Sequence, residues 1–284
     1  MLPTVPKRQV AYPAYRLVNE QKMLTYPEIS PVAVSLGPVA IHWYGLTYLV
    51  GFIAVWWLGN IRARKPDSGW KSEEISDLLF YGALGVILGG RFGYIIFYNF
   101  GVFVDDPLML FRIWQGGMSF HGGMLGVFVA MWLFGRKTGR SFFQVTDFMA
   151  PFVPIGLGAG RIGNFINGEL WGRPTELPWG MVFPFVDSQP RHPSMLYEAL
   201  LEGLLLFVIL WFYSSKPRPF RAVSGMFMLC YGVFRFGVEF VRVPDEHLGF
   251  IALDWVTMGH LLSAPMILFG LFLLTLAYSR RGKS

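Results

Sequence analysis

Charge is what this sequence has little of. Lys, Arg, Asp and Glu make up 15% of its 284 residues, whereas 54% are hydrophobic and 17% are aromatic. A soluble domain carries about 25% charged residues, so this deficit argues against an ordinary soluble protein and predicts a membrane protein. The formal net charge is +6, but the basic residues lie in short clusters between apolar runs. We therefore expect a lipid bilayer as partner, and no nucleic acid.

Cysteine is almost absent too. Cys230 is the single cysteine and lies in an apolar stretch, so the sequence allows no internal disulfide and no CxxC motif. We expect Cys230 to fill space in the core, and any thiol chemistry to use a thiol from a substrate. No second His or Cys lies at metal-ligand spacing near His121, so we expect no metal site.

The first 22 residues also lack something, namely the apolar core of a cleavable signal peptide. They are polar and contain four basic residues against one acidic residue. Met23 begins a stretch that reads like a second start. We therefore expect residues 1–22 to be a disordered extension, followed by a membrane domain over residues 23–284.

Long hydrophobic runs dominate the rest of the chain. A transmembrane helix needs about 20 mainly apolar residues, and seven segments meet that requirement. They lie near residues 39–59, 75–99, 117–135, 145–166, 194–213, 222–242 and 254–278. The sequence therefore predicts an all-α polytopic membrane protein with seven transmembrane helices.

The loops between these segments predict the orientation. Thirteen Lys and Arg residues lie in loops 60–74, 136–144 and 214–221 and in the C-terminal tail, whereas the alternate loops hold four. The positive-inside rule then puts the N-terminus outside and the C-terminus inside. The largest outer loop, 167–193, is rich in Pro, Gly and aromatic residues and is expected to form a small extracytoplasmic head. Residues 105–114 are expected to lie at the outer interface as a short amphipathic piece.

Polar residues within the predicted spans gather at one depth. An ionisable residue costs about 2.5–3.5 kcal/mol at the centre of a transmembrane helix and marks a functional site. Asp147, near the inner end of its span, is the exception, and we expect it to be an interfacial cap. The others lie toward the outer leaflet: Tyr44, Arg91, His121, Arg161, Asn164, Glu198, Glu202, Arg235 and Glu239.

Two spacings give this layer a geometry. Arg161 and Asn164 are three residues apart in the glycine-rich stretch 160–172, so a continuing helix puts them on one face. Tyr231, Arg235 and Glu239 follow at i, i+4 and i+8 and form one stripe. The plainer alternatives are a capped helix end for the first motif and an Arg–Glu ion pair for the second. His121, flanked by glycines, is compatible with a helix-end hydrogen bond or with catalysis.

Several arginines around a dry pocket indicate an anion that arrives from the lipid, and a phospholipid phosphate is the simplest candidate. The residues alone leave three functions open: an enzyme acting on a lipid headgroup, a transporter or scramblase of anionic lipids, and a lipid-binding scaffold. A translocation path needs polar groups through the full thickness of the membrane. The single depth observed here therefore disfavours the transporter.

Six blocks of this sequence resemble the bacterial prolipoprotein diacylglyceryl transferase family. They are residues 41–45 (IHWYG), 89–94 (GGRFGY), 119–123 (SFHGG), 160–172 (GRIGNFINGELWG), 192–198 (HPSMLYE) and 231–240 (YGVFRFGVEF). The likeness runs from about Met23 to the C-terminus, and residues 1–22 have no usual counterpart. It implies an enzyme of the bacterial inner membrane with its active site toward the outer leaflet.

The resemblance also implies the reaction. The family transfers the diacylglyceryl group of phosphatidylglycerol to the lipobox cysteine thiol of a preprolipoprotein and releases glycerol 1-phosphate, with no metal or nucleotide cofactor. By resemblance, Arg161 and Arg235 hold the phosphate and His121 takes the thiol proton. An arginine field that lowers the thiol pKa is the alternative to a base. Substrate contacts or support are expected from Tyr44, Arg91, Asn164, Asn167, Glu169, Gly172, Glu198, Tyr231 and Glu239.

Overall fold

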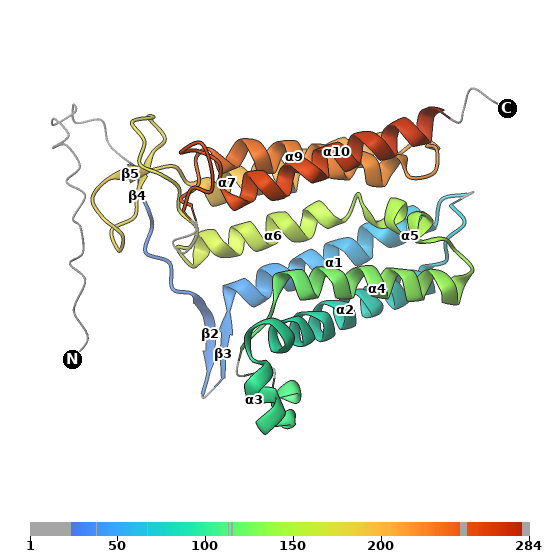
Figure 1. Cartoon of the computed structure of the whole chain (residues 1–284), viewed down its shortest axis with the longest axis horizontal. Helices are drawn as coiled ribbons and strands as arrows, with labels where there is room; N and C mark the ends of the chain where they lie inside the picture. Colours follow the sequence, from blue (N-terminus) through green and yellow to red (C-terminus); the bar gives the residue numbers. More distant parts are fainter. Residues whose placement is uncertain are drawn as a thin grey trace.

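Long helices lying side by side dominate this computed structural model (Figure 1). The structure describes residues 24–37, 39–66, 68–112, 114, 116–244 and 249–279. The predicted extension 1–22 and the basic residues after 279 lie outside this range. In Figure 1, α9 and α10 form the upper layer, α6 and α1 lie below them, and α2 and α4 form the lowest layer. The short strands lie at one end of the helices, with β4 and β5 near α7 and with β2 and β3 beside the start of α1.

Each of the seven predicted spans contains a helix. The helices are α1 (Trp43–Ala63), α2 (Ser72–Tyr98), α3 (Phe100–Asp105), the 3₁₀ helix η1 (Pro107–Phe111), α4 (Phe120–Thr138), α5 (Phe142–Met149), α6 (Val153–Ile166), α7 (Ser194–Glu198), the π-helix η3 (Ala199–Leu205), α8 (Leu206–Tyr213), α9 (Ala222–Glu239) and α10 (Met258–Ser279). Among the described residues, five helical segments are long and apolar enough to cross a membrane, and six if the α5–α6 pair counts as one span. Helix α4, whose last turn contains Arg136 and Lys137, is not among them.

Two of the predicted spans differ from the observed helices, one at its start and one in its middle. The span expected over 39–59 begins as a β-hairpin, because β2 (Val32–Leu36) pairs antiparallel with β3 (Val39–His42) before α1 starts. The span expected over 145–166 is broken, and α5 and α6 meet at an angle of 51°. Pro151 and Pro154 lie at that break, where their missing N–H groups prevent a continuous helix.

Glycine faces bring α2 and α4 together. A Cβ atom added to Gly89 would lie 2.7 Å from the Cα of Gly126, and one added to Gly93 would lie 2.7 Å from the Cα of Gly122. No side chain fits at such distances, so glycine is required for this approach. The pair packs against α1 and α5 around an apolar core that includes Phe134 and Val145, both fully buried.

Asp147 confirms its expected role as a cap. Its Oδ2 accepts a hydrogen bond from the backbone N–H of Arg221 at 2.7 Å, and its Oδ1 accepts one from the backbone N–H of Ser224 at 2.8 Å. These groups lie at the start of α9, where helical N–H groups have no partner within the helix. The carboxylate therefore ties α5 to α9 at the end of the bundle remote from the strands.

Residues 167–193, the predicted head, contribute two strands to a small sheet whose third strand comes from the start of the described chain. Its strand order is β1 (Leu24–Thr25), β4 (Met181–Val182) and β5 (Pro190–Arg191). Tyr26 follows β1 and is buried against Phe183, with ring centroids 5.4 Å apart. Its hydroxyl donates to the carbonyls of Phe165 and Ile166 at 2.8 Å. This contact satisfies carbonyls at the end of α6, and thereby fixes the helix end that carries Arg161 and Asn164.

Candidate active site

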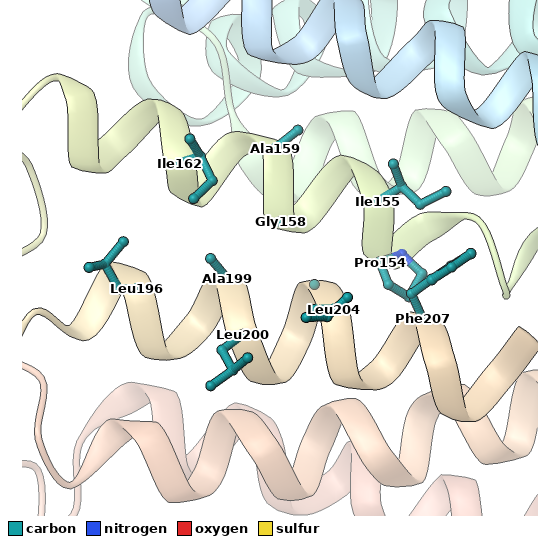
Figure 2. Close-up of a pocket in the computed structure, with 11 residues that line it drawn as sticks. Pro154, Ile155, Gly158, Ala159, Ile162, Leu196, Ala199, Leu200, Leu204 and Phe207 are labelled. Atoms are coloured by element: carbon teal, nitrogen blue, oxygen red, sulfur yellow. The ribbon is translucent and has the colours of Figure 1, made fainter.

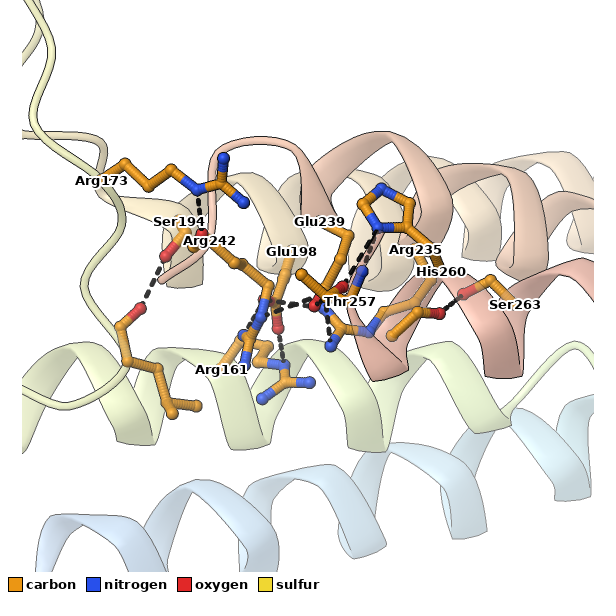
Figure 3. Close-up of polar contacts among 12 residues, drawn as sticks. Arg161, Arg173, Ser194, Glu198, Arg235, Glu239, Arg242, Thr257, His260 and Ser263 are labelled. Atoms are coloured by element: carbon orange, nitrogen blue, oxygen red, sulfur yellow. Dashed lines mark hydrogen bonds and ion pairs between the residues drawn. The ribbon is translucent and has the colours of Figure 1, made fainter. Parts of the chain in front are cut away.

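A completely buried carboxylate organises the polar cluster at the strand end of the helices. Glu198, the last residue of α7, accepts contacts from three arginines that come from different parts of the chain (Figure 3). Arg161 of α6 approaches it through Nε and Arg242 through Nη1. Arg235 of α9 completes the set, with Nη1 3.4 Å from Oε1. The structure therefore brings together Arg161, Arg235 and Glu198, as the sequence predicted.

A second buried carboxylate, Glu239, joins two of these arginines. Its Oε2 lies 2.8 Å from Arg235 Nη2 and 3.4 Å from Arg242 Nε. The expected i,i+4 ion pair between Arg235 and Glu239 is therefore confirmed. Thr257 donates to the other oxygen of Glu239 at 2.7 Å, which fixes the carboxylate from a third direction. Two glutamates thus hold three guanidinium groups in one orientation.

The end of α6 adds amide groups to the cluster. Arg161 Nη1 donates to Asn164 Oδ1 at 3.4 Å, as the three-residue spacing suggested. Asn164 and Asn167 then donate to the two oxygens of Glu169, at 3.0 and 3.2 Å. Gly168 turns the chain with φ at +68°, a conformation in which glycine is favoured. These four polar residues therefore form one chain of contacts that begins at Arg161.

Gly172 lies where the head meets the end of α9. Its N–H donates to the carbonyl of His192 at 2.7 Å, and a Cβ added there would lie 2.8 Å from the Cβ of His192. The neighbouring Arg173 donates through Nε to the carbonyl of Arg242 at 2.7 Å. Burial lowers the pKa of Arg173. Close backbone packing at Gly172 therefore holds the segment that carries Arg242.

An ion pair strengthens the same part of the head. Arg191 donates through Nε to Asp187 Oδ1 at 3.2 Å, and its Nη2 contacts the other oxygen. The hydrogen bonds from Arg191 hold the pKa of Asp187 below its ordinary value. Burial lowers the pKa of His192, which therefore favours its neutral form.

The two predicted tyrosines lie beside the cluster. The ring of Tyr44 packs against Gly163 of α6, where an added Cβ would lie 2.7 Å from a ring carbon. Its hydroxyl lies 3.3 Å from that of Tyr48. Tyr231 is one turn before Arg235 on α9 and stacks on Phe227, with ring centroids 5.7 Å apart.

Arg91 and His121 lie apart from the described contacts of the cluster. Arg91 is buried in α2, and its guanidinium donates to five backbone carbonyls, those of Met109, Leu110, Arg112, Gly116 and Gly117. His121 is exposed at the start of α4, and its described contact is an edge-to-face one with Phe120 at 5.6 Å. Substrate contact by Arg91 and proton transfer by His121 therefore stay predictions.

Sequence reasoning missed several members of the cluster. In the sequence, Arg242 and Arg173 are two of the four basic residues of the alternate loops, with no role predicted, yet Arg242 contacts both buried glutamates. The i,i+3 spacing of Glu239 and Arg242 was a signal that could have found it. His260 is buried behind Thr257, whose backbone N–H donates to its Nδ1 at 3.2 Å. Nothing in its apolar neighbourhood along the sequence pointed to this site.

An apolar groove of about 500 Å³ runs between α6 and the helix formed by α7, η3 and α8 (Figure 2). Ile162 lines it directly after Arg161, and Leu196 and Ala199 line it on either side of Glu198. The groove continues past Leu204 to Phe207. Hydrocarbon surface and the partly buried guanidinium of Arg161 thus lie next to each other on α6.

The arrangement can bind an anion that is attached to hydrocarbon. Three arginines face two contacting carboxylates, Glu198 and Glu239, in a setting where charges interact strongly because little water screens them. Guanidinium groups held in this way offer planar N–H donors suited to phosphate. The fold therefore defines a polytopic helical membrane protein, and this cluster is its candidate site for an anionic amphiphile.

Comparison with known proteins identifies the family. The family model described as prolipoprotein diacylglyceryl transferase matches residues 31–276. The chain is similar to phosphatidylglycerol–prolipoprotein diacylglyceryl transferases from three bacteria. It is 60% identical over 260 residues to that of Ectopseudomonas mendocina, covering 91% of this chain and 98% of the relative. It is 58% identical to those of Pseudomonas aeruginosa strain LESB58 and Coxiella burnetii strain RSA 331, covering 91% of this chain and 97% and 99% of the relatives. The chain belongs to the prolipoprotein diacylglyceryl transferase family, which confirms the resemblance in its motifs.

Proposed function

We propose that this chain is a transferase that moves the diacylglyceryl group of phosphatidylglycerol to the cysteine thiol of a prolipoprotein, the first step of lipoprotein maturation. The observation that carries the proposal is the contact of Arg161, Arg235 and Arg242 with the buried Glu198, in a chain of this family. The acceptor is the lipobox cysteine of a preprolipoprotein signal peptide. The products are a thioether-linked lipid and glycerol 1-phosphate.

The protein crosses the bacterial inner membrane seven times, with its N-terminus outside and C-terminus inside. Two contacts between the predicted cytoplasmic loops agree with this topology, which requires these loops to lie on the same side of the membrane. Arg140 pairs with Glu74 at 2.7 Å, and Arg62 donates to Ser214 at 2.7 Å. The C-terminal ends of α1 and α4 lie at the end of the bundle opposite to β4 and β5 (Figure 1). With the basic loops inside, the arginine cluster lies toward the outer leaflet.

The arginines act on the phosphate that leaves. The sulfur attacks a glyceryl carbon, the carbon–oxygen bond to phosphate breaks, and its electron pair stays on the phosphate oxygen. Donors that are already oriented stabilise that developing charge without reorganising. Arg161 and Arg235 fill this role, since Glu198 and Glu239 fix their positions. Asn164 contacts the headgroup, and the apolar groove provides hydrocarbon surface beside the phosphate.

The thiol must lose its proton during the reaction. A free thiol has a pKa of about 8.5 and is only a few per cent thiolate at neutral pH. His121 is the proposed base, and the field of the arginines is the alternative that lowers the thiol pKa directly. These alternatives predict different pH profiles for a His121 variant.

A lipidation assay tests the function. The purified protein in detergent is incubated with phosphatidylglycerol and a peptide that contains a lipobox cysteine. The expected result is a gain of one diacylglyceryl mass on the peptide and release of glycerol 1-phosphate in equal amount. A peptide with serine in place of the cysteine is the matched control and should stay unmodified. Movement of the lipid between leaflets of vesicles without any modified peptide would instead support a transporter.

A further inference from the structure

Glu202 is a third buried carboxyl group close to the arginine cluster, and the proposed reaction leaves it without a role. Its side chain is completely buried. Neither carboxyl oxygen has a hydrogen-bond partner among the described residues. Glu198, one turn earlier, instead contacts three arginines. The two glutamates are therefore in different electrostatic situations although they lie on the same stretch of helix.

The backbone holds Glu202 in this position. It lies within η3, the π-helix over Ala199–Leu205, and π-helical turns are rare and occur mostly at functional sites. The next residue, Gly203, packs directly on α6, where an added Cβ would lie 2.7 Å from the Cα of Gly158. Because the backbones touch there, η3 cannot rotate to expose Glu202 without separating the two helices.

Charged and titratable side chains face Glu202 from α6, from α7, from α9 and from the segment after α9. The positive charges of Arg161, Arg235 and Arg242 favour the ionised form of Glu202, whereas the negative charge of Glu198 disfavours it. Tyr231 is also within electrostatic range. The arginines that face Glu202 are in contact with Glu198 or Glu239. A buried carboxylate with no donor of its own is costly, and the neutral acid avoids that cost.

The protonation state of Glu202 decides the charge of the site. Four arginines, Arg161, Arg173, Arg235 and Arg242, contribute four positive charges, and three carboxylates, Glu169, Glu198 and Glu239, contribute three negative charges. The cluster therefore carries one net positive charge when Glu202 is neutral and none when Glu202 is ionised. A phosphodiester such as the phosphatidylglycerol headgroup carries a single negative charge.

We propose that Glu202 is a positioning residue held as the neutral acid, so that the net charge of the cluster matches a singly charged phosphodiester. This inference rests on the proposed function. Ionisation of Glu202 removes the net positive charge and adds a negative charge close to the phosphate. The site therefore selects its lipid by charge balance as well as by direct contacts.

The test is lipid binding without peptide, measured across pH for the wild type and Glu202→Gln. Glutamine is a neutral isostere, so the two proteins should bind phosphatidylglycerol within about twofold of each other near pH 6. As the pH rises to about 9, the wild type should lose about tenfold in affinity, whereas Glu202→Gln should keep it (tenfold is about 1.4 kcal/mol). Glu202→Met, an apolar residue of similar size, should behave like Glu202→Gln.

Two controls separate this effect from other titrations. Glu176→Gln changes an exposed glutamate in the head and should keep the alkaline loss of the wild type. Tyr231→Phe removes the neighbouring phenol, and whatever its affinity for the lipid near pH 6, it should lose affinity toward pH 9 by the same factor as the wild type. The proposal is overturned if Glu202→Gln shows the same alkaline loss as the wild type, or if it binds the lipid more tightly at every pH, since Glu202 would then be ionised throughout. Absence of phosphatidylglycerol binding by the wild type at every pH overturns it as well.

The lipidation assay on the wild type separates the two proposals. Lipid binding with the expected pH behaviour but no transfer to the peptide would reject the transferase function and keep the charge assignment of Glu202. Transfer without the Glu202-dependent pH effect would reject the charge assignment alone.

Discussion

Arg91 and the three clustered arginines are all sparingly exposed, but the groups around them differ. The guanidinium of Arg91 donates to five backbone carbonyls between Met109 and Gly117, which matches its five N–H donors. Arg161, Arg235 and Arg242 contact carboxylates and keep N–H groups outside those contacts. The side chain of Arg161 is 22% exposed, so a ligand can reach it.

This difference shows that burial of an arginine does not by itself indicate a ligand site. Arg91 connects α2 to the turn-rich segment around η1, and its geometry favours a structural role over the expected substrate contact. In the cluster, glutamates fix the guanidinium groups and leave positive charge for an anion. The number of donors already used is therefore more informative than depth in the membrane.

Removal of a clustered arginine should have the largest effect on activity. We expect Arg161→Ala and Arg235→Ala to lower transfer by about 1000-fold, because preorganised donors stabilise the charge of the leaving phosphate. The assay is mass spectrometry of the lipidated peptide. Both variants should elute from detergent size exclusion like the wild type, and full activity in either would remove the assignment to phosphate.

The region of Arg91 also contains His121, whose variant tests whether that region takes part in chemistry. We expect His121→Asn to lower the rate by about 100-fold, as removal of a general base does. The measurement is the rate of peptide lipidation from about pH 6 to about pH 9. A profile that moves to higher pH with little other loss would favour the arginine field over the histidine.

Substitution of Arg91 should change stability more than chemistry. Arg91→Met leaves five carbonyl contacts unmade, and each buried unsatisfied group costs about 1–3 kcal/mol before the segment relaxes. We expect a lower thermal midpoint and faster proteolysis of residues 100–117. The folded fraction should keep its affinity for phosphatidylglycerol within a few fold. Loss of lipid binding by a protein that remains fully folded would show that Arg91 is a ligand residue after all.

The ion pair of the head should give the smallest effect. Because the pKa of Asp187 is lowered in the folded state, its stabilising contribution is present above its unfolded pKa of about 3.9 and is lost as the pH falls through the folded pKa. Asp187→Asn should therefore destabilise the protein at neutral pH, by about 1 kcal/mol or less for a partly exposed pair. The difference in thermal midpoint from the wild type should close below about pH 4.

Hydropathy predicted the helical segments well but not their local breaks. Three of the four residues of β3 are apolar and two of these are β-branched, so a hydropathy window cannot separate this strand from the start of a span. The break between α5 and α6 had a visible signal in Pro151 and Pro154, which the length of the apolar run obscured. The π-helical turn at Ala199–Leu205 has no sequence signature, since it depends on packing against Gly158.

The candidate site was predictable where helical spacing connects its members. Arg235 with Glu239 and Arg161 with Asn164 follow from that spacing. Glu198 and Arg242 meet although they are 44 residues apart, and only the packing of α7 against the end of α9 shows this. The family motifs supplied the roles of the arginines, which spacing alone left open.

The glycine faces of α2 and α4 limit where lipids can enter and leave the protein. Where Gly89 and Gly93 meet Gly126 and Gly122, the two backbones are in direct contact and leave no slit as wide as an acyl chain. A lipid substrate and its product are both too bulky to pass there. Lipids therefore cannot diffuse from the bilayer into the protein between α2 and α4. The entry and exit routes of lipids must lie between other helices.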